Sequence, residues 1–92
     1  MKQVPVLVTT KHRGVFFGFA STDELNNEHI VLARCRNCIM WTAEVRGFLG
    51  LAATGPLNGC RIGAEVPLFL VRDVTGVAMC TDQAASAWTT FK

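Results

Sequence analysis

The sequence predicts an α+β domain: a small curled antiparallel β-sheet or half-barrel with one central and one C-terminal helix. The chain has 92 residues, which is enough for one hydrophobic core, so we expect residues 1–92 to form a single domain. Half of the residues are hydrophobic and 17% are charged, whereas about 25% are charged in an ordinary soluble domain. Short runs of β-branched and aromatic residues alternate with turn residues, which is typical of a β-rich fold with tight connections.

Composition and charge exclude several classes of protein. A disordered chain has low hydrophobicity and high net charge, and this chain has neither. Its net charge of +2 is too small for a protein that coats nucleic acid. Every apolar run is far shorter than the roughly 18 residues that span a bilayer, and the run at residues 4–8 is too short for a signal peptide. We therefore expect a cytoplasmic protein whose four cysteines are reduced thiols.

The N-terminal segment predicts a β-hairpin. Residues 4–10 are rich in β-branched side chains, residues 11–14 form a polar tip that ends in glycine, and residues 15–20 form the returning strand. The returning strand is apolar on both faces, so we expect both faces to be covered. Gly18 inside it indicates a bulge or a close approach of another backbone.

A short helical turn at Asp23-Glu24 and a turn at Asn26-Asn27 precede the next strand. This strand begins at residues 30–33 and can continue towards Met40. Arg34 and Arg36 are expected on one of its faces, because side chains in a strand repeat every two residues.

Residues 42–54 change to a helical period. Thr42 can cap this predicted helix, and Gly55-Pro56 ends it. Gly47 and Gly50 oppose a helix by about 1 kcal/mol each relative to alanine. One stripe of the helix is formed by Val45, Phe48, Leu49 and Ala52.

The last third predicts a loop, two strands and a helix. The loop covers residues 57–67, and the strands cover residues 68–72 and 74–81 with a bend at Asp73. The helix covers residues 83–89 and is capped by Thr81 or Asp82.

The spacing of Cys35 and Cys38 has three interpretations. Two thiolates separated by two residues can share a zinc ion, but a tetrahedral site needs two further ligands, and no second pair is present in the sequence. A redox pair would begin a helix, whereas this pair precedes a strand-like segment. We favour small hydrophobic residues in a reduced core, so we expect no metal and no cofactor.

Catalytic residues receive little support. His12 and His29 lie in loop-like segments, and the carboxylates are scattered without a paired motif. We therefore expect a binding protein and not an enzyme.

The most distinctive segment is glycine-rich and covers residues 47–63. Small residues can expose backbone N–H groups to an anion, and Arg46 and Arg61 flank the segment. The alternative is close helix packing together with glycines required by turns. The candidate ligand-binding residues are Trp41, Arg46, Gly47, Thr54, Gly59 and Arg61.

Five stretches of the chain resemble a family of small uncharacterised proteins encoded in phages and prophages. The stretches are VLVTT at residues 6–10, HRGVFFG at 12–18, CIMWTAEVRG at 38–47, GLAATGP at 50–56 and GCRIG at 59–63. The resemblance implies a phage accessory protein that acts in the cytoplasm of the host cell, and it supplies no activity and no site. Small phage proteins of this kind include inhibitors of host defence, among them oligomers that sequester nucleotide signals.

Self-association is the firmest functional expectation. A chain of this length buries only about 60–65% of its unfolded surface, so an apolar chain with few charges leaves hydrophobic side chains exposed. A second copy of the chain is the common way to cover them. We therefore expect a homo-oligomeric binding module for a small anionic, nucleotide-like ligand, with Arg46 and Arg61 on its phosphate and Trp41 stacked on its ring. A protein–protein module that inhibits a host protein and a small RNA-binding barrel are the alternatives.

Overall fold

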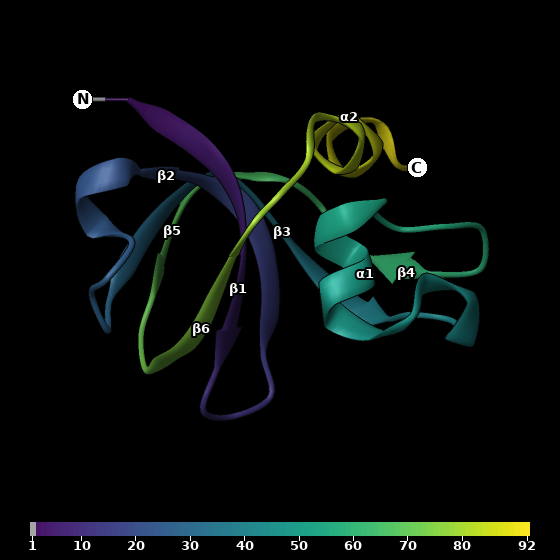
Figure 1. The fold of residues 1–92 in the computed structure, drawn as a ribbon, viewed down its shortest axis with the longest axis horizontal. Coiled ribbons are helices and arrows are strands. Elements are labelled where there is room, and N and C mark those ends of the chain that lie inside the picture. Colours follow the sequence, from purple (N-terminus) through teal and green to yellow (C-terminus); the bar gives the residue numbers. More distant parts are fainter. Residues whose placement is uncertain (1) are drawn as a thin grey trace.

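The computed structural model describes residues 2–92 and confirms the predicted architecture (Figure 1). Six antiparallel strands form one open sheet, accompanied by two α-helices and two single turns of 3-10 helix. The elements in chain order are β1 (Gln3–Thr10), β2 (Val15–Ser21), the turn η1 (Thr22–Glu24), β3 (Ile30–Met40), the turn η2 (Ala43–Val45), α1 (Gly47–Ala53), β4 (Arg61–Ile62), β5 (Val66–Val71), β6 (Val74–Met79) and α2 (Asp82–Thr90). Neither helix is long and apolar enough to cross a membrane within these residues.

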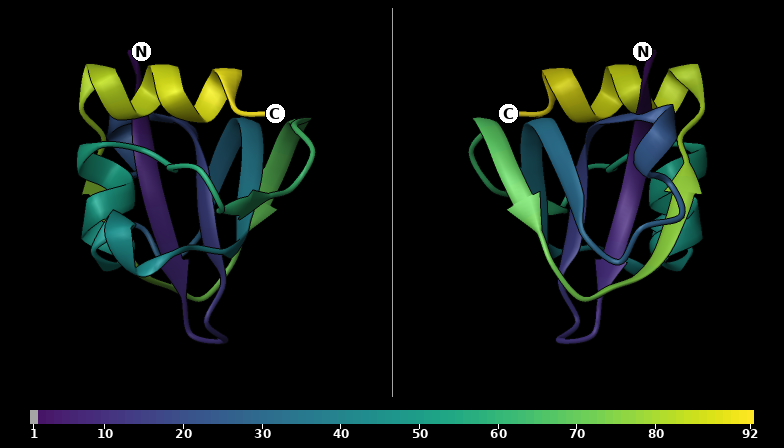
Figure 2. Two further views of the ribbon diagram at one scale, coloured as in Figure 1. Left: turned by 90° about the vertical axis from the view of Figure 1, so that its right-hand side faces the viewer. Right: turned by 90° about the vertical axis from the view of Figure 1, so that its left-hand side faces the viewer.

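The sheet is curled, and its two outermost long strands follow one another in the chain. The strand order is β4-β3-β2-β1-β6, and β5 pairs with β3 beside β4. β5 and β6 thus lie on opposite sides of the sheet and diverge from the turn that joins them, as the right-hand view of Figure 2 shows. At this turn Asp73 has a φ of 57°, and its carbonyl accepts a hydrogen bond from the Lys11 N–H at 2.9 Å. The predicted bend at Asp73 is therefore confirmed. It joins β5 and β6, which form the two outer sides of the curled sheet.

Both faces of the sheet are covered, as the apolar pattern of β2 predicts. One face packs against α1 and α2, and the concave face packs against side chains of the curled sheet itself. The helix-side cluster consists of Leu7, Val15, Phe17, Val45, Leu51, Ala52, Cys60, Ala84 and Trp88. The inner cluster consists of Val6, Val8, Ala20, Ile30, Leu32, Cys35 and Val71.

Both the bulge and the close approach of another strand, which the sequence predicts at Gly18, are present. The register between β2 and β3 shifts between Phe17 and Phe19, which is a β-bulge. A Cβ atom at Gly18 would lie 2.7 Å from the Cβ of Leu32, which is closer than two carbon atoms pack. Glycine therefore lets β3 cross β2 closely at the bulge.

The predicted central helix is shorter than expected, and its start was wrong. Residues 43–45 form the separate turn η2, Arg46 is left-handed with a φ of 70°, and α1 begins only at Gly47. The hydroxyl of Thr42 caps neither element. Glycine at residue 50 accommodates this break, because the Val45 carbonyl lies where a Cβ of residue 50 would stand.

The loop predicted at residues 57–67 was too long. It contains the two-residue strand β4, and β5 begins at Val66, so Pro67 lies within a strand. A proline is tolerated there because β5 lies at the edge of the sheet.

The C-terminal helix forms where the sequence predicts it. The hydroxyl of Thr81 accepts a hydrogen bond from the Ala84 N–H at 3.0 Å and caps α2. Trp88 is fully buried, stacks on Phe17 with ring centroids 5.2 Å apart, and donates its indole N–H to the Leu51 carbonyl at 3.0 Å. This side chain joins α2 to the sheet and to α1.

Candidate functional site

The glycine-rich segment forms a shallow hollow that contains two of the six predicted ligand-binding residues. Arg46 and Thr54 line a depression of about 350 Å³ beside η2 and α1. The other lining residues are Glu44, Val45, Leu49, Gly50, Ala53 and Leu57. Glu44 places a carboxylate in the same hollow, which opposes the binding of an anion. The hydroxyl of Thr54 lies 3.1 Å from the Gly50 carbonyl, so the helix end already engages it.

The other four predicted residues do not line this hollow. Trp41 follows β3 with 38% of its surface exposed, and exposed Arg61 pairs with Met40 in the short β3–β4 ladder. Gly47 has a φ of 80° and open space around it, while Gly59 has a φ of 96° and lies against the Thr42 methyl. The two glycines therefore serve backbone turns, which is the alternative that the sequence left open.

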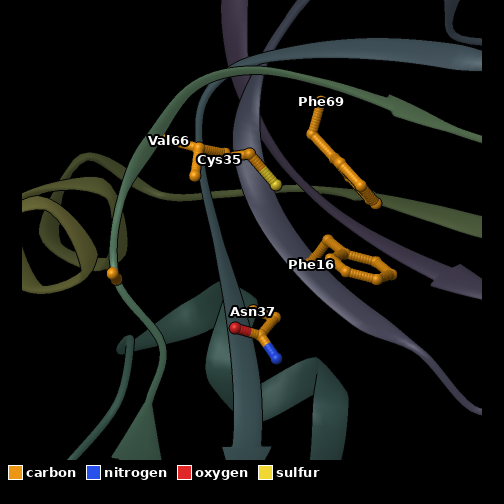
Figure 3. A pocket seen from close by; sticks show the side chains of 6 residues that line it. Phe16, Cys35, Asn37, Val66 and Phe69 are labelled. Carbon is orange, nitrogen blue, oxygen red and sulfur yellow. The ribbon is translucent and has the colours of Figure 1, made fainter.

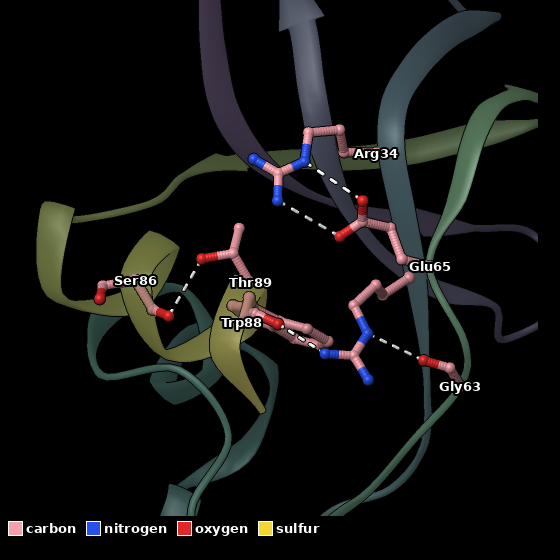
Figure 4. A network of polar contacts seen from close by, with 7 residues as sticks. Arg34, Gly63, Glu65, Ser86, Trp88 and Thr89 are labelled. Atoms are coloured by element: carbon pink, nitrogen blue, oxygen red, sulfur yellow. Dashed lines mark hydrogen bonds and ion pairs between the residues drawn. The ribbon is translucent and has the colours of Figure 1, made fainter. Parts of the chain in front are cut away.

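Two arginines of β3 have structural partners that the sequence did not reveal (Figure 4). The Arg36 guanidinium donates to three backbone carbonyls, at 2.9 Å to Gly63, 2.8 Å to Trp88 and 2.7 Å to Phe91. Two of these carbonyls lie at the C-terminal end of α2, where the helix leaves them unpaired and where its dipole favours a cation. Arg36 therefore anchors α2 to the sheet and is not available to a ligand.

Arg34 occupies a left-handed position in β3, with a φ of 52°. Its side chain forms an ion pair with Glu65 at 3.2 Å and lies over the Phe19 ring, 5.8 Å from the centroid. Both groups of the ion pair are substantially exposed, so the pair positions Arg34 more than it stabilises the fold.

Cys35 and Cys38 lie on opposite faces of the sheet. Cys35 is part of the inner cluster, and Cys38 packs against the helix-side cluster. A separation of three residues along a strand places side chains on opposite sides, so this pair cannot chelate one metal ion. All four cysteines are free thiols, as expected. Within residues 2–92, no group of three or more potential ligands comes together to hold a metal.

Burial raises the pKa of three of these thiols above the usual 9.0. The pKa of Cys35 rises to about 11 and that of Cys80 to about 12, both through burial. The pKa of Cys38 rises to about 11, mainly through burial and also through the nearby Cys60 thiol. A thiol with a raised pKa stays neutral at physiological pH, so these three groups are poor nucleophiles.

These pKa values predict a loss of stability in alkaline solution. In the unfolded chain the thiols ionise near pH 9, whereas in the fold they stay protonated until about pH 11 to 12. The folded state therefore binds more protons in this window, and the free energy of unfolding should fall as the pH rises above about 9. The sequence has no tyrosine that would titrate alongside.

Urea unfolding under reducing conditions, at about pH 8 and about pH 10.5, measures this effect. The Cys80→Ala variant should show a shallower decline, because it lacks one of the three groups. An unfolding free energy that is equal at both pH values would contradict the raised pKa values.

Both histidines are exposed and lie in connections between strands. His12 lies in the turn between β1 and β2, and His29 immediately precedes β3.

A second cavity, which the sequence did not indicate, lies at the concave side of the sheet. Figure 3 shows the Cys35 sulfur and the rings of Phe16 and Phe69 directed into one space, with the Asn37 amide close by. The cavity has a volume of about 220 Å³ and is lined by Phe16, Cys35, Asn37, Ala64, Val66 and Phe69. These residues come from β2, β3 and β5, except Ala64, which lies in the connection between β4 and β5. They meet only because β5 pairs with β3, which is a long-range contact with no local signal in the sequence.

The edge strand β5 presents the most apolar exposed surface of the fold. All six of its residues are uncharged, and five of them are exposed. Leu68 is 64% exposed and Leu70 is 51% exposed. They pair with Ala33 and Val31 of β3 and lie on the face opposite to the inner cluster. Along its outer side β5 pairs with no strand within residues 2–92.

Comparison with known proteins identifies the family of the chain. The model of a domain of unknown function (DUF6948) matches residues 3–88. No curated protein and no solved structure matches the chain. The match covers all six strands, α1 and most of α2. The chain therefore belongs to the DUF6948 family.

Proposed function

We propose that the protein is a homo-oligomeric binding module that self-associates through β5. The observation that carries this proposal is the exposure of Leu68 and Leu70 on an uncharged strand at the edge of the sheet. Natural edge strands are usually protected by charged side chains or by a covering segment, and an exposed apolar edge attracts another strand. Within β5 only Pro67 interrupts the row of backbone donors.

A second copy of the chain is the occupant that this surface fits best. Two β5 strands placed antiparallel about a twofold axis perpendicular to the sheet keep the same face outward on both copies. The exposed leucines of the two copies then lie side by side across the joined strands, where each covers part of the other's surface. Because β5 contains no charged residue, no like charges face each other when two copies of this strand pair.

The double variant Leu68→Glu/Leu70→Glu tests the interface. It places carboxylates of the two copies beside one another across the paired strands and removes the apolar contacts between their leucines, and each such cross-strand pair is worth roughly 0.2–1 kcal/mol. The dissociation constant of the oligomer should therefore rise by at least about tenfold. Sedimentation velocity over a range of protein concentrations measures the change.

The control is Leu49→Glu on α1, because Leu49 is 66% exposed and lies away from β5. It should assemble as the unchanged protein does, and circular dichroism should show that all three proteins are folded. A double variant that assembles as well as the unchanged protein would remove β5 from the interface.

The anionic, nucleotide-like ligand stays a prediction, as does a phage accessory role. Arg46 beside Thr54 supports the ligand, and Glu44 in the same hollow opposes it. Arg61 and Trp41 lie outside that hollow, so a ligand that used all four residues would have to extend beyond it.

A further inference from the structure

The concave cavity has the features of a binding site for a small uncharged molecule. Its walls are mostly apolar, and the rings of Phe16 and Phe69 lie with centroids 5.1 Å apart and planes tilted by 37°. Aromatic guests bind to such rings through stacked or edge contacts. The Cys35 thiol at the wall is neutral at physiological pH because burial raises its pKa to about 11. The cavity therefore offers no charge to a ligand.

One polar group in the wall lacks a partner. The backbone carbonyl of Asn37 accepts a hydrogen bond from the Gly63 N–H at 2.8 Å, which fixes the residue in place. Its side-chain amide is exposed to solvent, has no hydrogen-bond partner among residues 2–92, and lies at the edge of the cavity in Figure 3. An apolar pocket with one positioned polar group is the usual design of a small-molecule site, because the polar group fixes the orientation of the ligand.

We propose that this cavity binds a small uncharged molecule that consists of one aromatic ring with one hydrogen-bonding substituent. The volume of about 220 Å³ is enough for a single ring, and the site is open to solvent on the side formed by Asn37, Ala64, Val66 and Phe69, which are all exposed. The ring would lie against Phe16 and Phe69, and the substituent would bond to the Asn37 amide. This site is independent of the proposed assembly, because Leu68 and Leu70 project from the other face of β5.

Titration with phenol and with toluene, followed by two-dimensional NMR of the labelled protein, tests the proposal. Both probes should bind with dissociation constants on the order of 1 mM, as expected for ligands of this size. The amide signals of Phe16, Asn37 and Val66 should shift on binding. If neither probe shifts these signals in a saturable way, the proposal is wrong.

The Ala64→Leu variant fills the cavity from its rim, where Ala64 is exposed. Binding of both probes should weaken at least tenfold. The matched control is Ala53→Leu, which makes the same change at an exposed alanine in the hollow beside α1. It should leave binding unchanged. Equal losses in the two variants, or none in Ala64→Leu, would overturn the location of the site.

The Asn37→Leu variant separates the polar contact from the apolar one. Leucine has nearly the shape of asparagine, so toluene should still bind. The ratio of phenol to toluene affinity should fall roughly fivefold, which corresponds to one hydrogen bond between neutral groups. A ratio that does not change would remove Asn37 from the site.

Discussion

Replacing Trp88 by alanine should lower the free energy of unfolding by about 4 kcal/mol, as large-to-small changes of a fully buried tryptophan do. The side chain is 0% exposed, stacks on Phe17 and bonds to the Leu51 carbonyl. Its loss leaves a cavity between α2, α1 and the sheet. In a domain of this size the Tm should fall by roughly 15–30 °C.

Trp41→Ala is the matched control, because Trp41 is 38% exposed and follows the last residue of β3. Its effect should be at most about half as large, because more than a third of its surface already lies in solvent. Thermal and urea unfolding must be compared at one protein concentration, because the proposed assembly would also stabilise the fold. If the two tryptophan variants lose equal stability, α2 does not pack on the sheet through Trp88.

Gly50→Ala should destabilise the protein by at least about 3 kcal/mol, at the upper end of what overpacking costs. A Cβ atom at residue 50 would overlap the Val45 carbonyl oxygen. Val45 is 2% exposed in the helix-side cluster, so its backbone cannot move without disturbing the core. The variant should therefore unfold at a much lower urea concentration than the unchanged protein.

The same substitution at Gly47 provides the comparison. A Cβ atom there meets nothing within 4 Å, although the φ of 80° strains any other residue. Gly47→Ala should cost only about 1–2 kcal/mol through this strain. A Gly50→Ala variant as stable as Gly47→Ala would show that η2 and α1 do not meet at Val45 and Gly50.

The sequence predicts those elements whose signals are local. The β1–β2 hairpin follows from two β-branched runs around a glycine-ended tip, and α2 follows from the cap at Thr81 and the helix formers after it. Even the bulge at Gly18 could be predicted, because a lone glycine in a strand has few other uses.

The predicted start of the central helix was wrong for a local reason that the spacing of its hydrophobic residues does not reveal. The predicted stripe assumed one continuous helix, but the left-handed Arg46 rotates the residues after it. Val45 and Ala52 are buried as predicted, whereas Leu49 is 66% exposed and Leu51 takes a core position instead. The spacing of hydrophobic residues does not show where the backbone adopts a left-handed conformation and the helix is interrupted.

The candidate site depended on long-range contacts that the sequence could not supply. Small residues near arginines suggested an anion site, but Gly50 and Gly59 serve close contacts within the chain. The concave cavity and the exposed face of β5 both require knowing that β5 pairs with β3 at the edge of the sheet. Apolar residues such as Leu68 have the same pattern in an edge strand as in a central one.

The mass of the unchanged protein in solution, measured by light scattering at micromolar concentration, tests most directly whether a second copy covers the exposed leucines. We predict a mass that is a whole multiple, two or more, of the 10.0 kDa chain. A mass of 10.0 kDa throughout the micromolar range would contradict self-association, and it would leave the apolar side chains of β5 without a partner to cover them.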